Sequence, residues 1–184
     1  MTAEQAEAPT TDGVDLSELL GRPRAEVLVV GCGNLIRGDD AAGPVLVRML
    51  AERGVPEWVR LVDGGTAGMD VAFAMRGARH VRVVDASRLG VPPGTVHRVP
   101  GDEVTDLDPP HGNLHRLRWD QALGFARWML KEDYPDDVEV WLVEGESFEP
   151  AAPLTPAVQR AVDQLAQTWC DEWAAQAPRA ASAR

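Results

Sequence analysis

The sequence predicts an α/β fold, a three-layer sandwich in which helices flank a mainly parallel, twisted sheet of roughly five strands. Short, continuously apolar runs alternate along the chain with segments whose apolar residues recur at helical spacing, and this alternation is typical of parallel sheets. Apolar types make up 45% of the 184 residues and charged types 26%, which is ordinary for a folded domain. A chain of this length suits one domain.

The expected strands are runs of apolar and β-branched residues. The run from Glu26 to Gly31 is apolar from its second residue onward, which is typical of a strand buried on both faces. The other four runs are Val59 to Val62, His80 to Val84, Thr95 to Val99 and Val138 to Val143.

The expected helices carry apolar stripes at helical spacing. The first covers Ala41 to Arg53, and the third covers His115 to Lys131. Between them, Thr66 could cap a second helix that ends at Gly77. The last helix has Pro156 in its first turn. Trp169 and Trp173 lie four residues apart on this last helix, so we expect them to pack it onto the sheet.

We expect a single domain over residues 26–177, a loose tail at 1–25 and a frayed tail at 178–184. The N-terminal segment lacks the features of a secretory signal, and no apolar run approaches the roughly 20 residues that span a bilayer. Two cysteines, Cys32 and Cys170, are too few for a disulfide framework. The sequence thus predicts a cytoplasmic protein without a membrane segment, and we expect a monomer.

The net charge of −11 comes from two segments of the chain. Residues 1–26 hold six acidic and two basic residues, and residues 131–149 hold eight acidic residues and one basic residue. The remainder of the chain is neutral overall. An acidic surface repels phosphate and anionic lipid, so nucleic-acid and membrane-surface binding are not expected.

A glycine-rich turn, Gly31 to Asp40, follows the first strand. It is not a dinucleotide-binding fingerprint, because Ile36 stands where the third glycine belongs. It is not a P-loop either, because Asp39 and Asp40 replace the Lys and Ser/Thr, and carboxylates would repel a polyphosphate. The turn is therefore expected to bind a cation or to do acid–base work.

Asp63 and Asp85 each end a predicted strand. The carboxyl ends of neighbouring parallel strands meet at one edge of a sheet, about 4.8 Å apart, so we expect these carboxylates to converge with Asp39 and Asp40. The alternative that a strand-end aspartate merely caps its loop stays open for each of them.

An imidazole could complete such a group of carboxylates, and together they would suit a divalent metal such as zinc or nickel. The candidates are His111 and His115, whereas His80 and His97 lie within strands and are expected to be structural. No Gly-x-Ser-x-Gly elbow is present, and Cys32 is expected to pack in the core rather than act as a nucleophile.

Taken in order, the motifs resemble those of the nickel–iron hydrogenase maturation endopeptidases, from about residue 26 to 173. The matching segments are Val30-Gly31-Cys32-Gly33-Asn34, Gly38-Asp39-Asp40, Asp63-Gly64-Gly65-Thr66, Val84-Asp85-Ala86, Pro92-Pro93-Gly94-Thr95, His115 and Glu146-Ser147-Phe148-Glu149-Pro150. One departure is that Ala41-Ala42-Gly43 follows the acid pair, where the family usually has glycine directly.

The resemblance implies an endopeptidase that removes the C-terminal extension of a hydrogenase large-subunit precursor after nickel insertion. Nickel carried by the precursor would be the recognition signal rather than a permanent cofactor. The resemblance assigns the catalytic and nickel-contacting roles to Asp40, Asp85 and His115, with His111 as a rival for the histidine and Asp63 shaping the site. It leaves open whether an aspartate or the metal activates the water.

Two other functions fit the same residues. One is an unrelated metal-dependent hydrolase that holds its own zinc. The other is a non-catalytic nickel chaperone or checkpoint, which would bind the precursor without shortening it.

Overall fold

A computed structural model describes residues 25–66, 68–104 and 119–180, and its five-stranded sheet confirms the predicted fold class. The strands, in chain order, are β1 (Ala25–Cys32), β2 (Val59–Gly65), β3 (Ala78–Ser87), β4 (Val96–Pro100) and β5 (Asp137–Glu144). Their order in the sheet is β2-β1-β3-β5-β4, and every pair is parallel except β4 with β5.

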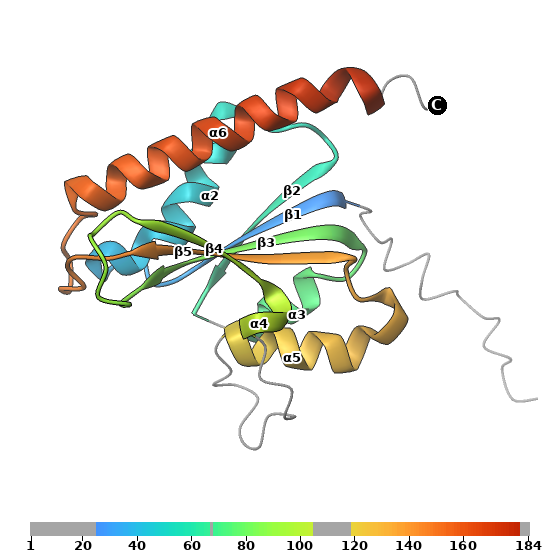
Figure 1. Ribbon diagram of the computed structural model, residues 1–184, viewed down its shortest axis with the longest axis horizontal. Coiled ribbons are helices and arrows are strands. Elements are labelled where there is room, and N and C mark those ends of the chain that lie inside the picture. Colours follow the sequence, from blue (N-terminus) through green and yellow to red (C-terminus); the bar gives the residue numbers. More distant parts are fainter. Residues whose placement is uncertain (1–24, 67, 105–118, 181–184) are drawn as a thin grey trace, which may run out of the picture.

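The helices form one layer on each face of the sheet, with α2 and α6 on one side and α3, α4 and α5 on the other (Figure 1). The helical elements are η1 (Gly38–Ala41), α2 (Ala42–Arg53), α3 (Gly68–Ala74), α4 (Gly101–Val104), α5 (Trp119–Leu130), η3 (Lys131–Asp133) and α6 (Pro156–Ala180). None of the helices in the described parts of the chain is both long and apolar enough to cross a membrane.

Each layer encloses its own apolar cluster. Between α2, α6 and the sheet, Leu46, Leu50 and Val162 pack with Trp169 and Trp173, both of which are buried as predicted. Trp169 also meets Trp141 of β5 edge to face, with ring centroids 5.3 Å apart. These aromatic contacts fix α6 on the sheet.

The cluster on the opposite face joins α3 and α5 to the other side of the same strands. Val30 of β1 and Val83 of β3 pack there against Met75, Leu123 and Ala126. The central strand β1 thus contributes to both clusters, and this explains its continuously apolar sequence.

The boundaries differ from the sequence prediction in several places. Helix α3 ends at Ala74 rather than Gly77, because the chain turns there and Gly77 has φ +79°. Helix α4 was not expected, since four residues show no periodicity. Helix α6 continues to Ala180, past the domain boundary expected at 177. Residues 1–24 and 181–184 of the predicted tails, and residues 115–118 of the helix predicted from His115, lie outside the described residues.

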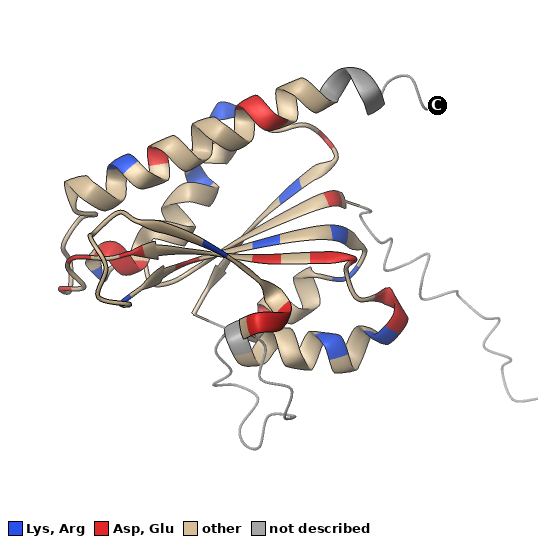
Figure 2. Cartoon of the chain, viewed as in Figure 1, with Lys and Arg blue, Asp and Glu red and all other residues tan. Residues whose placement is uncertain are grey.

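Acidic residues gather where η3 leads into β5, at the amino edge of the sheet (Figure 2). Glu132, Asp133 and Asp136 line a surface pocket there. Much of the charge expected over residues 131–149 is therefore at the edge opposite the turn that follows β1. Glu144 and Glu146 lie at the carboxyl edge instead. The Glu144 carboxylate accepts from Leu89 N–H, and Glu146 N–H donates to Asp39.

Candidate functional site

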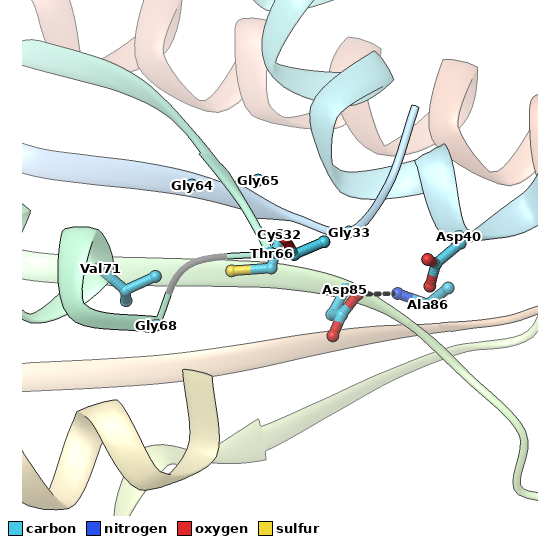
Figure 3. A pocket seen from close by; sticks show the side chains of 10 residues that line it. All are labelled: Cys32, Gly33, Asp40, Gly64, Gly65, Thr66, Gly68, Val71, Asp85 and Ala86. Atoms are coloured by element: carbon cyan, nitrogen blue, oxygen red, sulfur yellow. Dashed lines mark hydrogen bonds between the residues drawn. The ribbon is translucent and has the colours of Figure 1, made fainter. Parts of the chain in front are cut away.

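A cavity of about 320 Å³ opens at the carboxyl edge of the sheet (Figure 3). The turn after β1, the β2–α3 connection and the end of β3 enclose it. Its lining residues are Cys32, Gly33, Asp40, Gly64, Gly65, Thr66, Gly68, Val71, Asp85 and Ala86. The predicted convergence at this edge is therefore observed for two of the four aspartates, Asp40 and Asp85.

Gly33 lies between the Asp40 backbone and the Asp85 side chain. A β-carbon placed on Gly33 would lie 1.8 Å from the Asp40 carbonyl oxygen and 3.5 Å from Asp85 Oδ1, and Gly33 has φ +126°. Both aspartates line the cavity with Ala86 (Figure 3), whose N–H donates to Asp85 Oδ1 over 2.8 Å. Among the described residues, no hydrogen bond reaches the Asp40 carboxylate, so it is available to a ligand.

Asp39 does not join them, and this corrects the expectation that the acid pair acts together. Its side chain is fully buried and turns away from the cavity toward residues 146–155. Its carboxylate accepts hydrogen bonds from the N–H groups of Glu146, Ser147 and Thr155 and from the Thr155 hydroxyl, at 2.7–3.1 Å. Those donors satisfy the buried charge.

Asp63 and Cys32 have supporting positions. Asp63 is exposed, does not line the cavity, and accepts a hydrogen bond from Gly65 N–H over 3.0 Å, so it shapes the β2–α3 turn. Cys32 is buried as predicted, and burial, followed by the negative charges of Asp85 and Asp63, raises the pKa of its thiol far above the ordinary value. A neutral, buried thiol is not a nucleophile.

Glu144, at the end of β5, holds the loop that follows Asp85. Its carboxylate is buried and accepts hydrogen bonds from Ser87 Oγ (2.8 Å) and from the N–H groups of Leu89 (2.8 Å) and Gly90 (2.7 Å). The hydrogen bond from the Leu89 backbone is the largest of the contributions that lower the pKa of Glu144 below its ordinary value.

The two carboxylates alone make an incomplete metal site. Within the described residues, no three or more His, Cys, Asp or Glu side chains are grouped so that they could hold a metal ion. The histidines predicted to complete the site, His111 and His115, lie outside the described residues. His80 and His97 do not line the cavity.

Comparison with known proteins assigns the family. The model of the hydrogenase maturation protease family (HycI) matches residues 44–172, more than half of the chain. The hydrogenase expression/formation protein HupD of Thiocapsa roseopersicina is 36% identical over 157 residues, which are 79% of this chain and 70% of HupD. The chain belongs to the hydrogenase maturation protease family.

Other relatives agree in sequence and in fold. The hydrogenase 2 maturation protease of Escherichia coli is 32% identical over 140 residues, 74% of this chain and 84% of the relative. The solved structure of the hydrogenase maturating endopeptidase HybD from E. coli superposes with a TM-score of 0.65 at 30% identity, covering 78% of this chain and 88% of HybD. This hydrogenase maturation protease is accordingly a peptidase with the predicted α/β fold.

The protease presents exposed apolar side chains on two loops at the carboxyl edge of the sheet. Leu35 and Ile36, 42% and 69% exposed, lie in the turn between β1 and η1, and Leu89, 58% exposed, lies in the loop after β3. Both loops are hydrogen bonded to residues 144–151: Ala151 N–H donates to the Ile36 carbonyl, and the Glu144 carboxylate accepts from Leu89 N–H. The backbone therefore holds these apolar groups in solvent at the edge of the sheet where the cavity opens.

Sequence reasoning missed what residues 144–155 of the protease contribute. The Glu146-Ser147-Phe148-Glu149-Pro150 segment was part of the family resemblance, but no role followed from it. In the structure this segment supplies the donors that bind Asp39.

Proposed function

We propose that this protease removes the C-terminal extension of a nickel–iron hydrogenase large-subunit precursor after nickel insertion, and that nickel in the precursor is its recognition signal. The observation that supports this most is the pairing of Asp40 and Asp85 at one cavity, with the Asp40 carboxylate open to a ligand. Two carboxylates fall short of a full coordination shell.

That shortage agrees with a metal that arrives with the substrate. Ligands from the precursor would supply the remaining positions, so the enzyme would bind the nickel-loaded form in preference to the nickel-free form. His115 is proposed as the third ligand from this chain, with His111 as the rival. Carboxylate oxygen and imidazole nitrogen are donors that nickel accepts.

A polypeptide substrate also fits the surroundings of the cavity. The cavity itself is too small for more than a short stretch of chain, so the flanking residues of the precursor must lie against the rim. Leu35, Ile36 and Leu89 offer apolar contact there.

The reaction is hydrolysis of one peptide bond. A water oxygen bonds to the carbonyl carbon, the carbon–nitrogen bond breaks, and a proton passes from the water to the leaving amine. In this proposal Asp40 and Asp85, which both line the cavity, contact the nickel or accept that proton.

The test is to substitute the proposed residues and follow shortening of the nickel-loaded precursor by mass spectrometry. Asp40→Asn, Asp85→Asn and His115→Ala should each abolish cleavage and leave the circular dichroism spectrum unchanged. Full cleavage by Asp40→Asn or Asp85→Asn would refute the site. Loss of cleavage with His111→Ala, together with full cleavage by His115→Ala, would move the histidine role to His111.

Two further outcomes point to other functions. Tight, stoichiometric zinc in the protein purified without precursor would indicate a hydrolase with a resident metal. Binding of the precursor by the wild-type protein without any loss of mass would indicate a checkpoint.

A further inference from the structure

We propose that Asp39 is a positioning residue for the peptidase reaction: it holds Asp40 at the cavity by tying η1 to the segment of residues 145–155. The inference rests on the proposed function, because it takes Asp40 as a residue of the reacting site. Asp39 itself does not line the cavity and is not a catalytic residue.

The tie between η1 and the 145–155 segment consists of hydrogen bonds in both directions. Asp39 Oδ2 accepts from Glu146 N–H (2.8 Å), Ser147 N–H (2.9 Å) and Thr155 Oγ1 (3.1 Å), and Asp39 Oδ1 accepts from Thr155 N–H (2.7 Å). In return, Asp39 N–H donates to the Ser147 carbonyl over 2.8 Å. Hydrogen bonds to an ionised carboxylate are stronger than those between neutral groups, and those at the carboxylate are part-buried.

Two glycines let the backbones of η1 and the 145–155 segment come close enough for these hydrogen bonds. A β-carbon on Gly38, which has φ +56°, would lie 2.6 Å from the Ser147 carbonyl oxygen. A β-carbon on Gly145 would lie 2.4 Å from the Phe148 ring and 3.2 Å from Asp39 Cβ. The contact is therefore tightly packed, and η1 cannot shift toward the segment.

Asp40 depends on this contact together with two local backbone hydrogen bonds, from Asp40 N–H to the Arg37 carbonyl and from Asn34 N–H to the Asp40 carbonyl. It follows Asp39 in a 3₁₀ helix of only four residues, η1, with no side-chain cap. No side chain among the described residues bonds to its carboxylate, so the η1 backbone sets its position. A displacement of about 1 Å at a reacting group can cost roughly 100-fold in rate.

Asp39 thus supports the backbone of the site, and Asp40 takes part in the proposed reaction. Glu144, directly before the 145–155 segment, binds the Ser87–Gly90 loop just beyond Asp85. Residues 144–155 therefore support both carboxylates of the cavity.

The experiment compares Asp39→Asn with a matched control, Glu139→Gln. In Asp39→Asn an amide nitrogen replaces one carboxylate oxygen, so at least one N–H loses its acceptor. Glu139 is also a buried carboxylate, 7% exposed, bound to Arg98 and to Trp141 Nε1, but it lies toward the opposite end of β5. Both variants should lose stability, since each takes an acceptor away from part-buried hydrogen bonds.

Kinetics on the nickel-loaded precursor, well below the melting temperature, separate the two variants. We expect Asp39→Asn to lower kcat about 10- to 100-fold with KM within about twofold, while Glu139→Gln keeps the wild-type kcat. Thr155→Val removes one donor and should lower kcat less, and Thr155→Ser should restore it. A folded Asp39→Asn with wild-type kcat overturns the proposal, and if that variant does not fold, wild-type kcat in Thr155→Val overturns it.

Hydrogen exchange keeps this inference separate from the proposed function. If the wild-type protein cleaves no precursor, the proposed function fails, but the amides of residues 38–41 still report the tie. They should exchange faster in Asp39→Asn than in the wild type or in Glu139→Gln. Equal exchange in all three proteins would overturn the positioning role.

Discussion

Replacing Gly43 with alanine should move the start of α2 away from the sheet and carry Asp40 with it. A β-carbon on Gly43 would lie 2.4 Å from the Cys32 carbonyl oxygen, 2.5 Å from the Val84 carbonyl oxygen and 2.7 Å from Cys32 N. Ordinary contact begins near 3.5 Å, so the gap must widen by about 1 Å. All three neighbours are backbone atoms of β1 and β3, and they cannot rotate aside as a side chain would.

The size of the effect follows from this displacement. Overpacking costs about 1–3 kcal/mol, and the better helix propensity of alanine returns up to about 1 kcal/mol. The variant should therefore melt several degrees lower, at about 2–4 °C per kcal/mol for a protein of this size. Because Asp40 precedes Gly43 by three residues, a shift of about 1 Å should reduce kcat roughly 100-fold.

Calorimetry and precursor cleavage measure the two effects, and Gly54→Ala is the control. Gly54 ends the same helix with φ +79° and ψ 136°, and a β-carbon there meets nothing within 4 Å, so alanine costs only the backbone strain, about 1–3 kcal/mol. It should lose stability but keep kcat. If Gly43→Ala matches Gly54→Ala in both measurements, the close helix–sheet contact does not position Asp40.

Two further predictions concern the rim and the loop beyond Asp85. Ile36→Ser should change stability by less than about 0.5 kcal/mol, because the side chain is 69% exposed, but it should raise KM for the precursor several-fold. Trp128 on α5 is 68% exposed, and Trp128→Ser should leave KM unchanged. Equal KM values for the two variants would refute a role for the rim. Glu144 has a lowered pKa in the folded protein, so its stabilisation is complete above the unfolded-state pKa of about 4.3 and is lost as the pH falls through the folded value. In denaturation between pH 6 and pH 3, the stability advantage of the wild type over Glu144→Gln should therefore shrink, and a constant advantage would contradict this.

The sequence predicted what depends on neighbours along the chain. The apolar run of β1 and the spaced apolar residues of α2 and α6 were sufficient for the three-layer fold, since burial on two faces or on one stripe leaves a periodic pattern. The pairing of Asp40 with Asp85 followed from topology, because β1 and β3 are adjacent and parallel.

The role of Asp39 could not be predicted in this way. Its partners are more than 100 residues away in the sequence, and they bind through main-chain N–H groups that carry no side-chain signature. Two adjacent aspartates look equivalent in a sequence, although one is buried and bonded and the other faces the cavity. The assignment of His115 over His111 stays a prediction from the family resemblance.

We expect the protease to cut a precursor only when nickel is present in it. Purified protein should be mixed with nickel-loaded and nickel-free large-subunit precursor, and the mass of each precursor followed over time. The nickel-loaded form should lose its C-terminal extension, and the nickel-free form should keep its full mass. Equal cleavage of both forms, or cleavage of neither, would contradict it.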